Sequence, residues 1–343
     1  MTWRGFGSDN HAGVHPEVLS AIAEANVGHA HAYGDDEWTV SAIATLQLVL
    51  GEEAQVAFVW NGTGANVVGL AAVCRPWESV ICSESAHITS DECAAPEHIA
   101  NVKLVSVQTP DGKLTPELVM PALTGFGFEH HAQPRVISVS NVTELGTVYT
   151  RHELRALADL AHSKGMLLHV DGARIANAAV ATGSTLSALT AEAGVDVLSL
   201  GGTKNGMLAG EAVVLFGSAR SDALPYVRKQ SGQLASKMRF VAAQFSAMYA
   251  TDLWHRCASQ ANAMAGRLAE GAKAHGIKPE FPVQANEIFV LLPDEVIIDL
   301  QERFHFYVLQ EGFAPGHSLV RWVTSWDTTP ADVDALVEAL PRA

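Results

Sequence analysis

Residues 195–211, VDVLSLGGTKNGMLAGE, hold the pattern that decides the fold. A short, largely apolar run over residues 195–200 ends in two glycines, and Lys204 follows in the next turn. Such a run is typical of a strand that is buried on both faces of a parallel sheet. Lys204 is one of only eight lysines in the chain. In this place it either caps a helix from the surface or loses its hydration, so that its amine can act as a nucleophile.

Short apolar runs of the same kind recur through the first two thirds of the chain. Stretches with helical periodicity separate them, and the clearest helix begins with a capping box of Thr150 and Glu153 and ends at Gly165. This alternation predicts βα repeats, and hence an α/β fold with a mostly parallel central sheet and helices on both faces. Besides residues 195–200, the predicted strands lie in residues 55–62, 79–86, 102–107, 135–141, 166–173 and 212–217.

The pattern becomes mainly helical after residue 217. A long helix over residues 252–276 is predicted to link two domains, and residues 287–293 and 319–326 resemble strands of a smaller α+β unit that closes with a helix from Pro330. We therefore predict three parts. They are an N-terminal segment (1–15) that contributes to the active site, a large domain (16–250) and a small C-terminal domain (251–343).

The composition excludes several classes of protein. The 343 residues include 22 basic and 37 acidic side chains, a net charge of −15 that disfavours nucleic acid as a partner. No apolar run is long enough to span a membrane and the first residues do not resemble a signal peptide, which predicts a cytoplasmic protein with no membrane partner. The cysteines and histidines lack metal-ligand spacing, so we predict no metal site and reduced, mostly buried thiols at Cys74, Cys82, Cys93 and Cys257.

Polar residues stand where several of the predicted strands end, and ligands bind at this edge of a parallel sheet. The turn Asn61-Gly62-Thr63-Gly64 leads into a helix, where free N–H groups could hold a phosphate, although a glycine-rich turn is more often structural. Asp171 ends another strand. Its carboxylate either pairs with Arg174 or faces the cation of a cofactor.

The combination of these features favours one cofactor. A phosphate-binding turn, a carboxylate and a lysine on three strand ends match the phosphate, the pyridine nitrogen and the aldehyde of pyridoxal phosphate, which Lys204 would hold as a Schiff base. His87 could stack on the pyridine ring, or be a hydrogen-bonded loop residue. Ser8 and Arg321 could bind a substrate carboxylate, although Arg321 taken alone is better explained by a surface ion pair.

Motifs along nearly the whole chain resemble those of the low-specificity L-threonine aldolases, which are pyridoxal-phosphate enzymes of the aspartate aminotransferase fold. The resemblance rests on "NGTGAN" (61–66), "AHITSDECAAPE" (86–97), "HVDGARIANA" (169–178), "LGGTKNGMLAGEAVV" (200–214) and "RWVTSWDTT" (321–329). It implies that Lys204 binds the aldehyde, that Asp171 pairs with the pyridine nitrogen and that His87 stacks on the ring.

The resemblance also implies the remaining roles. The turn of residues 61–64 would hold the phosphate, with Arg239 of a neighbouring subunit. Ser8, Arg174 and Arg321 would orient the amino acid, with Arg174 also binding the cofactor near its phenolic oxygen. Tyr33 would act across an interface. Family members are tetramers built from dimers that share active sites, which implies a homotetramer.

One departure from the family concerns the segment SVSNVTELGT (138–147), which has no histidine where many members carry one near the substrate hydroxyl. Asn141, Val142, Thr143 and Glu144 stand there instead. His87, Glu144 or a water molecule is therefore left as the base for that hydroxyl.

The resemblance implies reversible cleavage of L-threonine, L-allo-threonine and related β-hydroxy-α-amino acids to glycine and an aldehyde. A β-eliminating lyase or an amino-acid racemase could use the same lysine, aspartate and phosphate turn, and a non-catalytic pyridoxal-phosphate-binding protein could keep them.

Overall fold

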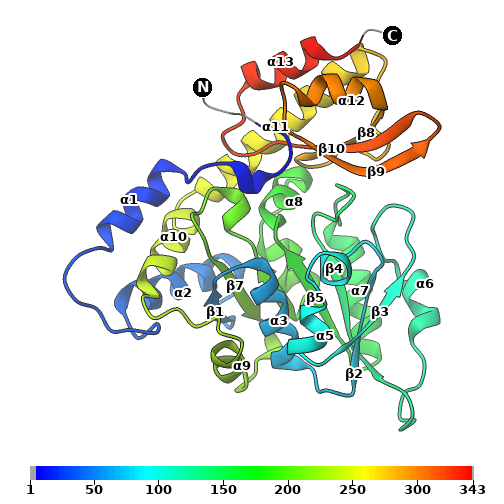
Figure 1. Cartoon of the computed structure of the whole chain (residues 1–343). Coiled ribbons are helices and arrows are strands. Elements are labelled where there is room, and N and C mark those ends of the chain that lie inside the picture. The colour runs from blue at the N-terminus through cyan, green and yellow to red at the C-terminus, as the bar shows by residue number, and fades with distance from the viewer. Residues whose placement is uncertain (1–4, 342–343) are drawn as a thin grey trace.

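The computed structural model describes residues 5–341 and contains two sheets (Figure 1). The larger sheet has seven strands in the order β1-β7-β6-β5-β4-β2-β3, and the smaller one has the order β8-β10-β9. The strands of the larger sheet are β1 (Gln55–Val59), β2 (Glu78–Ser83), β3 (Lys103–Val107), β4 (Gln133–Ser140), β5 (Leu167–Gly172), β6 (Val197–Leu200) and β7 (Glu211–Leu215). Each of the seven overlaps a predicted apolar run, with β2, β4 and β7 beginning one or two residues earlier, which confirms that these runs form strands.

Strand direction in the large sheet follows the prediction with one exception. The pairs among β3, β2, β4, β5 and β6 are parallel. Strand β7 is antiparallel to both of its neighbours, β6 and β1. Consequently β1 runs in the same direction as β6, and the first residue of β7 lies at the edge of the sheet where β1, β5 and β6 end.

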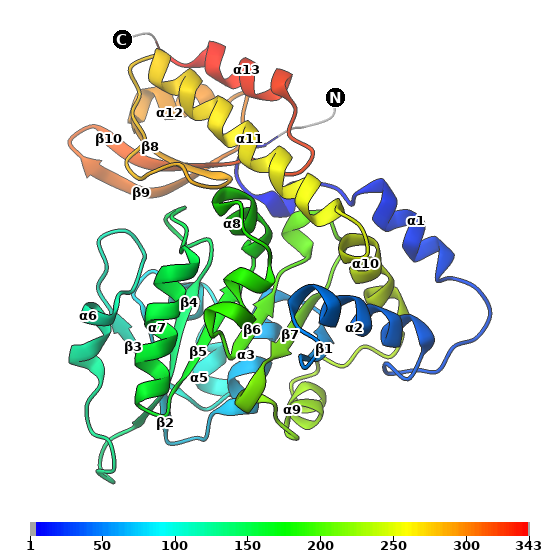
Figure 2. The same ribbon diagram turned by 180° about the vertical axis from the view of Figure 1, so that it is seen from behind.

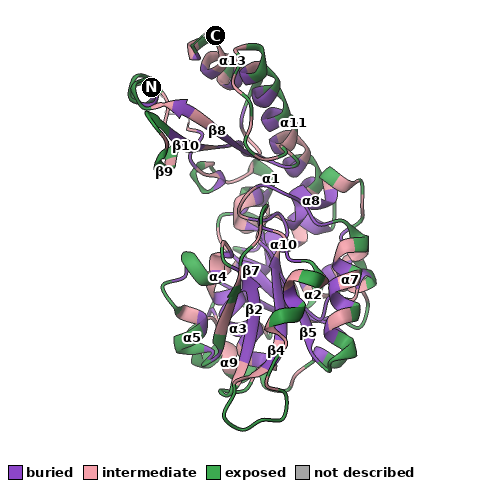
Figure 3. Cartoon of the chain, turned by 90° about the vertical axis from the view of Figure 1, so that its right-hand side faces the viewer, coloured by how far each residue is buried: buried purple, intermediate pink, exposed green. Residues whose placement is uncertain are grey.

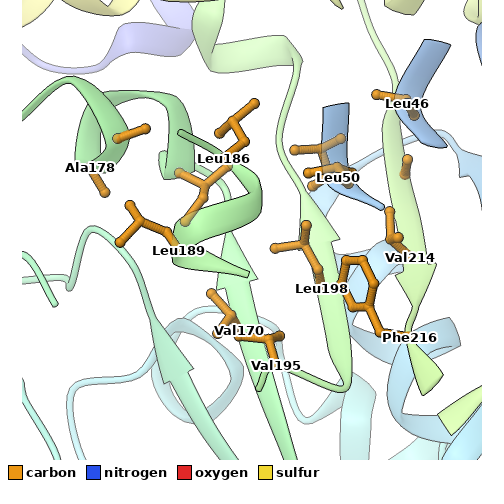
Figure 4. Close-up of a cluster of buried hydrophobic side chains, with 14 of the residues drawn as sticks. Leu46, Leu50, Val170, Ala178, Leu186, Leu189, Val195, Leu198, Val214 and Phe216 are labelled. Carbon is orange, nitrogen blue, oxygen red and sulfur yellow. The ribbon is translucent and has the colours of Figure 1, made fainter. Parts of the chain in front are cut away.

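Both faces of the large sheet are covered by helices, as predicted. Successive side chains point to opposite faces: Leu198 and Val214 belong to one apolar cluster, while Val197 and Val213 belong to the other. Figure 4 shows part of the first cluster, which α2 and α8 help to form. Figure 3 shows the central strands buried and the outer surfaces of the helices exposed.

The helices are α1 (Pro16–Glu24), α2 (Glu37–Leu50), α3 (Gly62–Val73), α4 (His87–Ser90), α5 (Ala95–Ile99), α6 (Pro116–Val119), α7 (Arg151–Ser163), α8 (Ile175–Thr182), α9 (Leu224–Gln230), α10 (Arg239–Tyr249), α11 (Leu253–Ala274), α12 (Asp294–Gln301) and α13 (Pro330–Ala339). Helix α7 has the predicted capping box, because the Thr150 and Glu153 side chains each accept from the other's backbone N–H. The long predicted linking helix is α11, which runs from the large sheet to the small one (Figure 2).

The small sheet is antiparallel and forms its own apolar cluster with α11, α12 and α13. Its strands are β8 (Glu287–Pro293), β9 (Tyr307–Ala314) and β10 (His317–Val323). The N-terminal segment joins this cluster, because Phe6 is buried in it and bonds through its backbone to His305 and Val323. The domain boundaries at residues 15 and 250 stay predictions, and residues 1–4 and 342–343 of the outer two parts lie outside the described residues.

The four cysteines are free; Cys82 and Cys257 are buried, Cys74 is partly buried and Cys93 is exposed, so the prediction of buried thiols is wrong for Cys93. Within residues 5–341, no helix has the length and apolar character needed to cross a membrane.

Candidate active site

A cavity of about 400 Å³ opens where β1, β2, β4, β5 and β6 end and β7 begins. Seven of the predicted site residues lie on its wall, so the structure brings together residues from four separate strand ends. They are Asn61, Gly62, Thr63, His87, Asp171, Arg174 and Lys204. The other lining residues are Asn10, Trp60, Asn66, Glu92, Ser140, Val142, Glu144, Ala173, Thr203, Ala209 and Glu211.

The N-terminus of α3 forms one end of the cavity. Asn61 caps this helix, because its side-chain oxygen accepts from Gly64 N–H at 2.8 Å and its carbonyl accepts from Ala65 N–H at 3.0 Å. The N–H groups of Gly62 and Thr63 precede these two bonds and lie on the cavity wall. Unpaired N–H groups at a helix start bind anions well. Nothing lies within 4 Å of where a Gly62 Cβ would be, so this side of the turn is open.

Gly64, predicted to help hold the phosphate, has a structural role instead. It does not line the cavity, and a Cβ on it would lie 2.3 Å from the side-chain amide carbon of Gln233. That amide oxygen accepts from Trp60 N–H at 2.9 Å. Gly64 is therefore needed because Gln233 packs tightly behind the turn and holds it.

Asp171 is buried at the end of β5 and does not pair with Arg174. Its Oδ1 accepts from Ala173 N–H at 3.0 Å and its Oδ2 accepts from the Asn66 side chain at 2.8 Å. The alternative of a buried Asp171–Arg174 pair is wrong. The carboxylate has capacity for a further donor, since each oxygen accepts up to two hydrogen bonds.

His87 begins the short helix α4 and contacts two carboxylates. Its Nδ1 lies 2.9 Å from Glu92 Oε1, and its backbone N–H donates to Glu144 Oε1 at 2.8 Å. The hydrogen bond to Glu92 is the main cause that raises the pKa of His87 above its ordinary value. Hydrogen bonds therefore hold His87 at both its imidazole ring and its backbone N–H.

Lys204 lies in a single 3-10 turn (Thr203–Asn205) after β6 and is partly buried on the cavity wall. This position excludes the alternative of a lysine that caps a helix from the surface. Glu211 holds the turn, because its carboxylate accepts from Gly202 N–H at 2.5 Å and from Thr203. Burial raises the pKa of Glu211 to about 7 although the charge of Lys204 lowers it.

The two glycines before Lys204 allow neighbouring backbone to approach. A Cβ on Gly201 would lie 2.4 Å from the carbonyl oxygen of Ala173, in the loop after β5. A Cβ on Gly202 would lie 2.4 Å from Met207 Sδ and 2.9 Å from Gly210 O. Gly201 therefore lets the loop that carries Lys204 pack against the loop that follows Asp171.

Arg174 belongs to a buried network of charges. Its Nε and Nη2 donate to the two oxygens of Asp9 at 2.7 and 3.1 Å, and its Nη1 lies 3.3 Å from Glu287 Oε2. Arg321 Nη1 lies 3.5 Å from the other oxygen of Glu287. The surface ion pair considered for Arg321 is thus replaced by a pair with a fully buried carboxylate, on β8.

Besides Gly64 and Arg321, three further predicted residues do not line the cavity of their own chain. Ser8 caps a short 3-10 turn by accepting from Asn10 N–H, and it lines a separate hollow of about 260 Å³. Tyr33 is half exposed, with Lys229 Nζ 5.0 Å from its ring centroid. Arg239 donates to the backbone oxygen of Val27 at 3.1 Å. The structure of one chain does not bring these residues to the site.

Glu144 stands at the cavity where the family histidine is missing. Its Oε1 accepts from Ser140 Oγ at 2.6 Å as well as from His87 N–H. Burial, the largest effect, raises the pKa of Glu144 to about 7. Of the three neighbours named with it, Val142 also lines the cavity, while Asn141 and Thr143 bond to the loop that leads into α7.

Sequence reasoning missed several residues that build the site. Asn66 is a polar residue in the buried part of α3, and Glu92 is the one buried residue of the α4–α5 turn. Glu211 begins a strand that runs against its neighbours. A polar residue within an apolar helix face was the available signal for Asn66. Among residues 5–341, no group of acidic, histidine or cysteine side chains could hold a metal ion.

The fold is that of the aspartate aminotransferases. A Thermus thermophilus aspartate aminotransferase superposes with a TM-score of 0.67 over 96% of this chain and 88% of that one, at 19% identity, a likeness of fold alone. The Leishmania major threonine aldolase structure has a TM-score of 0.92 and 31% identity, and covers 97% of both chains.

Sequence comparison defines the group within this fold. The family model for beta-eliminating lyases matches residues 5–295. The low-specificity L-threonine aldolase of Pseudomonas aeruginosa is 44% identical over 94% of this chain and 93% of its own, and that of a Pseudomonas species is 40% identical over 96% and 95%. The chain belongs to the beta-eliminating lyase family, in its group of low-specificity L-threonine aldolases.

Proposed function

We propose that this chain binds pyridoxal phosphate and cleaves L-threonine and related β-hydroxy-α-amino acids to glycine and an aldehyde. The observation that carries the proposal is one cavity wall on which Lys204, Asp171 and the open N-terminus of α3 occur together. The names of the relatives supply the reaction, since both Pseudomonas proteins and the Leishmania protein are called threonine aldolases.

The residues present fit the cofactor. The Gly62 and Thr63 N–H groups and the Thr63 hydroxyl suit a phosphate, and the buried Asp171 suits a protonated ring nitrogen. The Lys204 amine would hold the cofactor through its aldehyde carbon. When bound, pyridoxal phosphate accepts the electron pair of the broken substrate bond into its ring.

The chain's own residues would orient the substrate and move its protons. Arg321 is the candidate for the substrate carboxylate, since its Nε has no acceptor among residues 5–341 and a guanidinium binds a carboxylate with two parallel hydrogen bonds. Arg174 stands beside it across Glu287, and the charges of the two arginines are balanced by Asp9 and Glu287. Fixing the carboxylate sets which bond to the α-carbon is broken. His87 and Glu144 are the groups on the cavity wall that could accept the hydroxyl proton.

We further propose that the enzyme is a cytoplasmic homotetramer of dimers that share active sites. Arg239 and Tyr33 lie away from the cavity of their own chain but are partly or half exposed, as residues that act across an interface must be in a single subunit. For Ser8 to contact the substrate, the separate hollow that Ser8 lines would have to open toward the cavity.

The test is a product assay on purified enzyme with the four stereoisomers of threonine. Glycine and acetaldehyde from L-threonine or L-allo-threonine support the proposal. A 2-oxoacid with ammonia would identify a β-eliminating lyase, in line with the name of the family model. Interconversion of the α-carbon configuration would identify a racemase, and no product with bound cofactor would identify a non-catalytic protein.

A further inference from the structure

Glu92 is a buried carboxylate to which the proposed reaction gives no role. Its side chain is fully buried, and its Oε1 lies 2.9 Å from Nδ1 of His87. Its Oε2 has no hydrogen-bond partner within residues 5–341. Burying a carboxylate costs about several kcal/mol unless a cation or hydrogen-bond donors compensate for the lost hydration. The burial of Glu92 therefore calls for an explanation.

Asn66 connects Glu92 to Asp171. Its Nδ2 lies 2.8 Å from Glu92 Oε1 and 2.8 Å from Asp171 Oδ2. An amide nitrogen carries two hydrogens, so each carboxylate receives one of them. The reversed amide would turn its oxygen toward two carboxylates, and this repulsion fixes the orientation. A continuous chain of hydrogen bonds therefore runs from His87 through Glu92 and Asn66 to Asp171.

The carboxylate of Glu92 determines where a neutral His87 keeps its hydrogen. An ionised carboxylate only accepts hydrogen bonds, so the imidazole must carry its hydrogen on Nδ1, and the lone pair is then on Nε2. A carboxylate that orients a histidine in this way also stabilises the imidazolium that forms when Nε2 takes up a proton.

We propose that Glu92 is a positioning residue that fixes His87 in the Nδ1–H form, so that His87 Nε2 removes the proton of the substrate β-hydroxyl. This inference rests on the proposed function. The O–H electron pair becomes the carbonyl bond of the aldehyde as the Cα–Cβ bond breaks. The pair of that bond remains with the glycine portion, whose α-carbon gains one proton and so balances the one that Nε2 takes.

The charges around His87 come from four segments. Glu92 and Asp171 raise the pKa of the imidazole and Lys204 lowers it. Glu144 meets the His87 backbone N–H rather than the ring. Of these groups, Glu92 alone is hydrogen-bonded to the imidazole within the part of the chain that the structure describes.

The first experiment measures the tautomer directly in the holoenzyme. Nitrogen-15 NMR of the imidazoles, with a His87→Asn variant to assign the signal among 15 histidines, should show hydrogen on Nδ1 and none on Nε2 above the pKa of His87. A neutral ring with its hydrogen on Nε2 would overturn the proposal. This readout needs neither a folded Glu92 variant nor turnover, so it decides the role of Glu92 even if threonine is not cleaved.

The second experiment compares Glu92→Gln with Glu97→Gln, which removes an exposed carboxylate on the adjacent helix α5. Glu92→Gln should lower the His87 pKa, and with it the acidic limb of the pH profile of kcat/KM, by about one unit, a tenfold loss of proton affinity. Glu97→Gln should move neither, and Glu92→Asp should restore part of the shift. A limb that stays in place while the NMR pKa moves would show that His87 is not the base.

Discussion

Arg174 binds both carboxylate oxygens of Asp9, a residue 165 positions earlier in the chain. Burial alone would raise the pKa of Asp9, but Arg174 and Lys204 outweigh it and hold this pKa below its ordinary value. The pair thus connects the N-terminal segment, which packs on the small sheet, to the end of a strand of the large sheet.

Asp9→Asn is expected to lower the free energy of unfolding by about 3 kcal/mol at pH 7, because it leaves the buried Arg174 with half of its compensation. A lowered pKa stabilises the fold above the unfolded value of about 4 and loses that effect as the pH falls through the folded value. The difference from wild type should therefore shrink below pH 4 in urea titrations. Asp35→Asn, at an exposed position, is the control, and a gap that is independent of pH would contradict the assignment.

Lys204→Ala should abolish both turnover and the long-wavelength absorbance of the lysine-bound cofactor, because the amine that would bind the aldehyde is lost. Lys237→Ala, at an exposed position two residues before the start of α10, should leave the spectrum as it is in wild type. An unchanged spectrum in Lys204→Ala would mean that another group binds the aldehyde.

Glu144→Gln should stabilise the cofactor-free protein at alkaline pH. The folded pKa of about 7 lies above the unfolded value of about 4.3, so the folded state binds the proton more tightly and loses stability as the pH rises between the two values. A neutral amide that still accepts from Ser140 and His87 avoids this loss. Unfolding in urea should show a gain of about 1–2 kcal/mol at pH 8 and almost none at pH 4. Equal gains at both values would refute the burial effect.

Gly201→Ala should destabilise the enzyme strongly, by about 3 kcal/mol or more, because its Cβ would meet the backbone oxygen of Ala173 at 2.4 Å. Gly266→Ala is the matched control, since this glycine lies within α11 and has open space at its Cβ position. That change should raise the melting temperature, as alanine stabilises a helix by about 1 kcal/mol relative to glycine. Similar melting temperatures for the two variants would contradict the close packing of the two loops.

Arg321→Lys should raise KM for threonine about tenfold, equivalent to about 1.4 kcal/mol, with a smaller change in cofactor affinity. A lysine keeps the charge near Glu287 but loses the planar fork that binds a carboxylate. Arg303→Lys, at an exposed position, is the control in the same steady-state assay. An unchanged KM would assign the substrate carboxylate to another group.

The large sheet was predictable because each of its strands is buried on both faces and therefore appears as a short apolar run. The direction of β7 was not predictable, since an apolar run does not indicate whether its strand is parallel or antiparallel to its neighbours. Strand β9 was missed for a physical reason as well. Most of its residues are exposed, and Gln310, Glu311 and Gly312 interrupt any apolar pattern.

The site was predictable where a residue follows a strand, because the topology then brings it to the common edge. Asp171 and Lys204 are of this kind. Glu92 and Asn66 are separated by 26 residues and Asn66 and Asp171 by 105, and no local pattern records such partnerships. Glu211 was missed because it is the first residue of its strand rather than one that follows it, and only the reversed direction of β7 brings it beside Lys204.

The placement of the two acidic partners of Arg174 has a consequence for biosynthesis. Asp9 is translated before Arg174, whereas Glu287 is translated long after it, on the first strand of the small sheet. Until then the guanidinium of Arg174 lacks one of its counter-charges, and Arg321 does not yet exist. All strands of the large sheet precede Glu287 in the chain, so that sheet can form on the nascent chain before the charge network of Arg174 and Arg321 is complete.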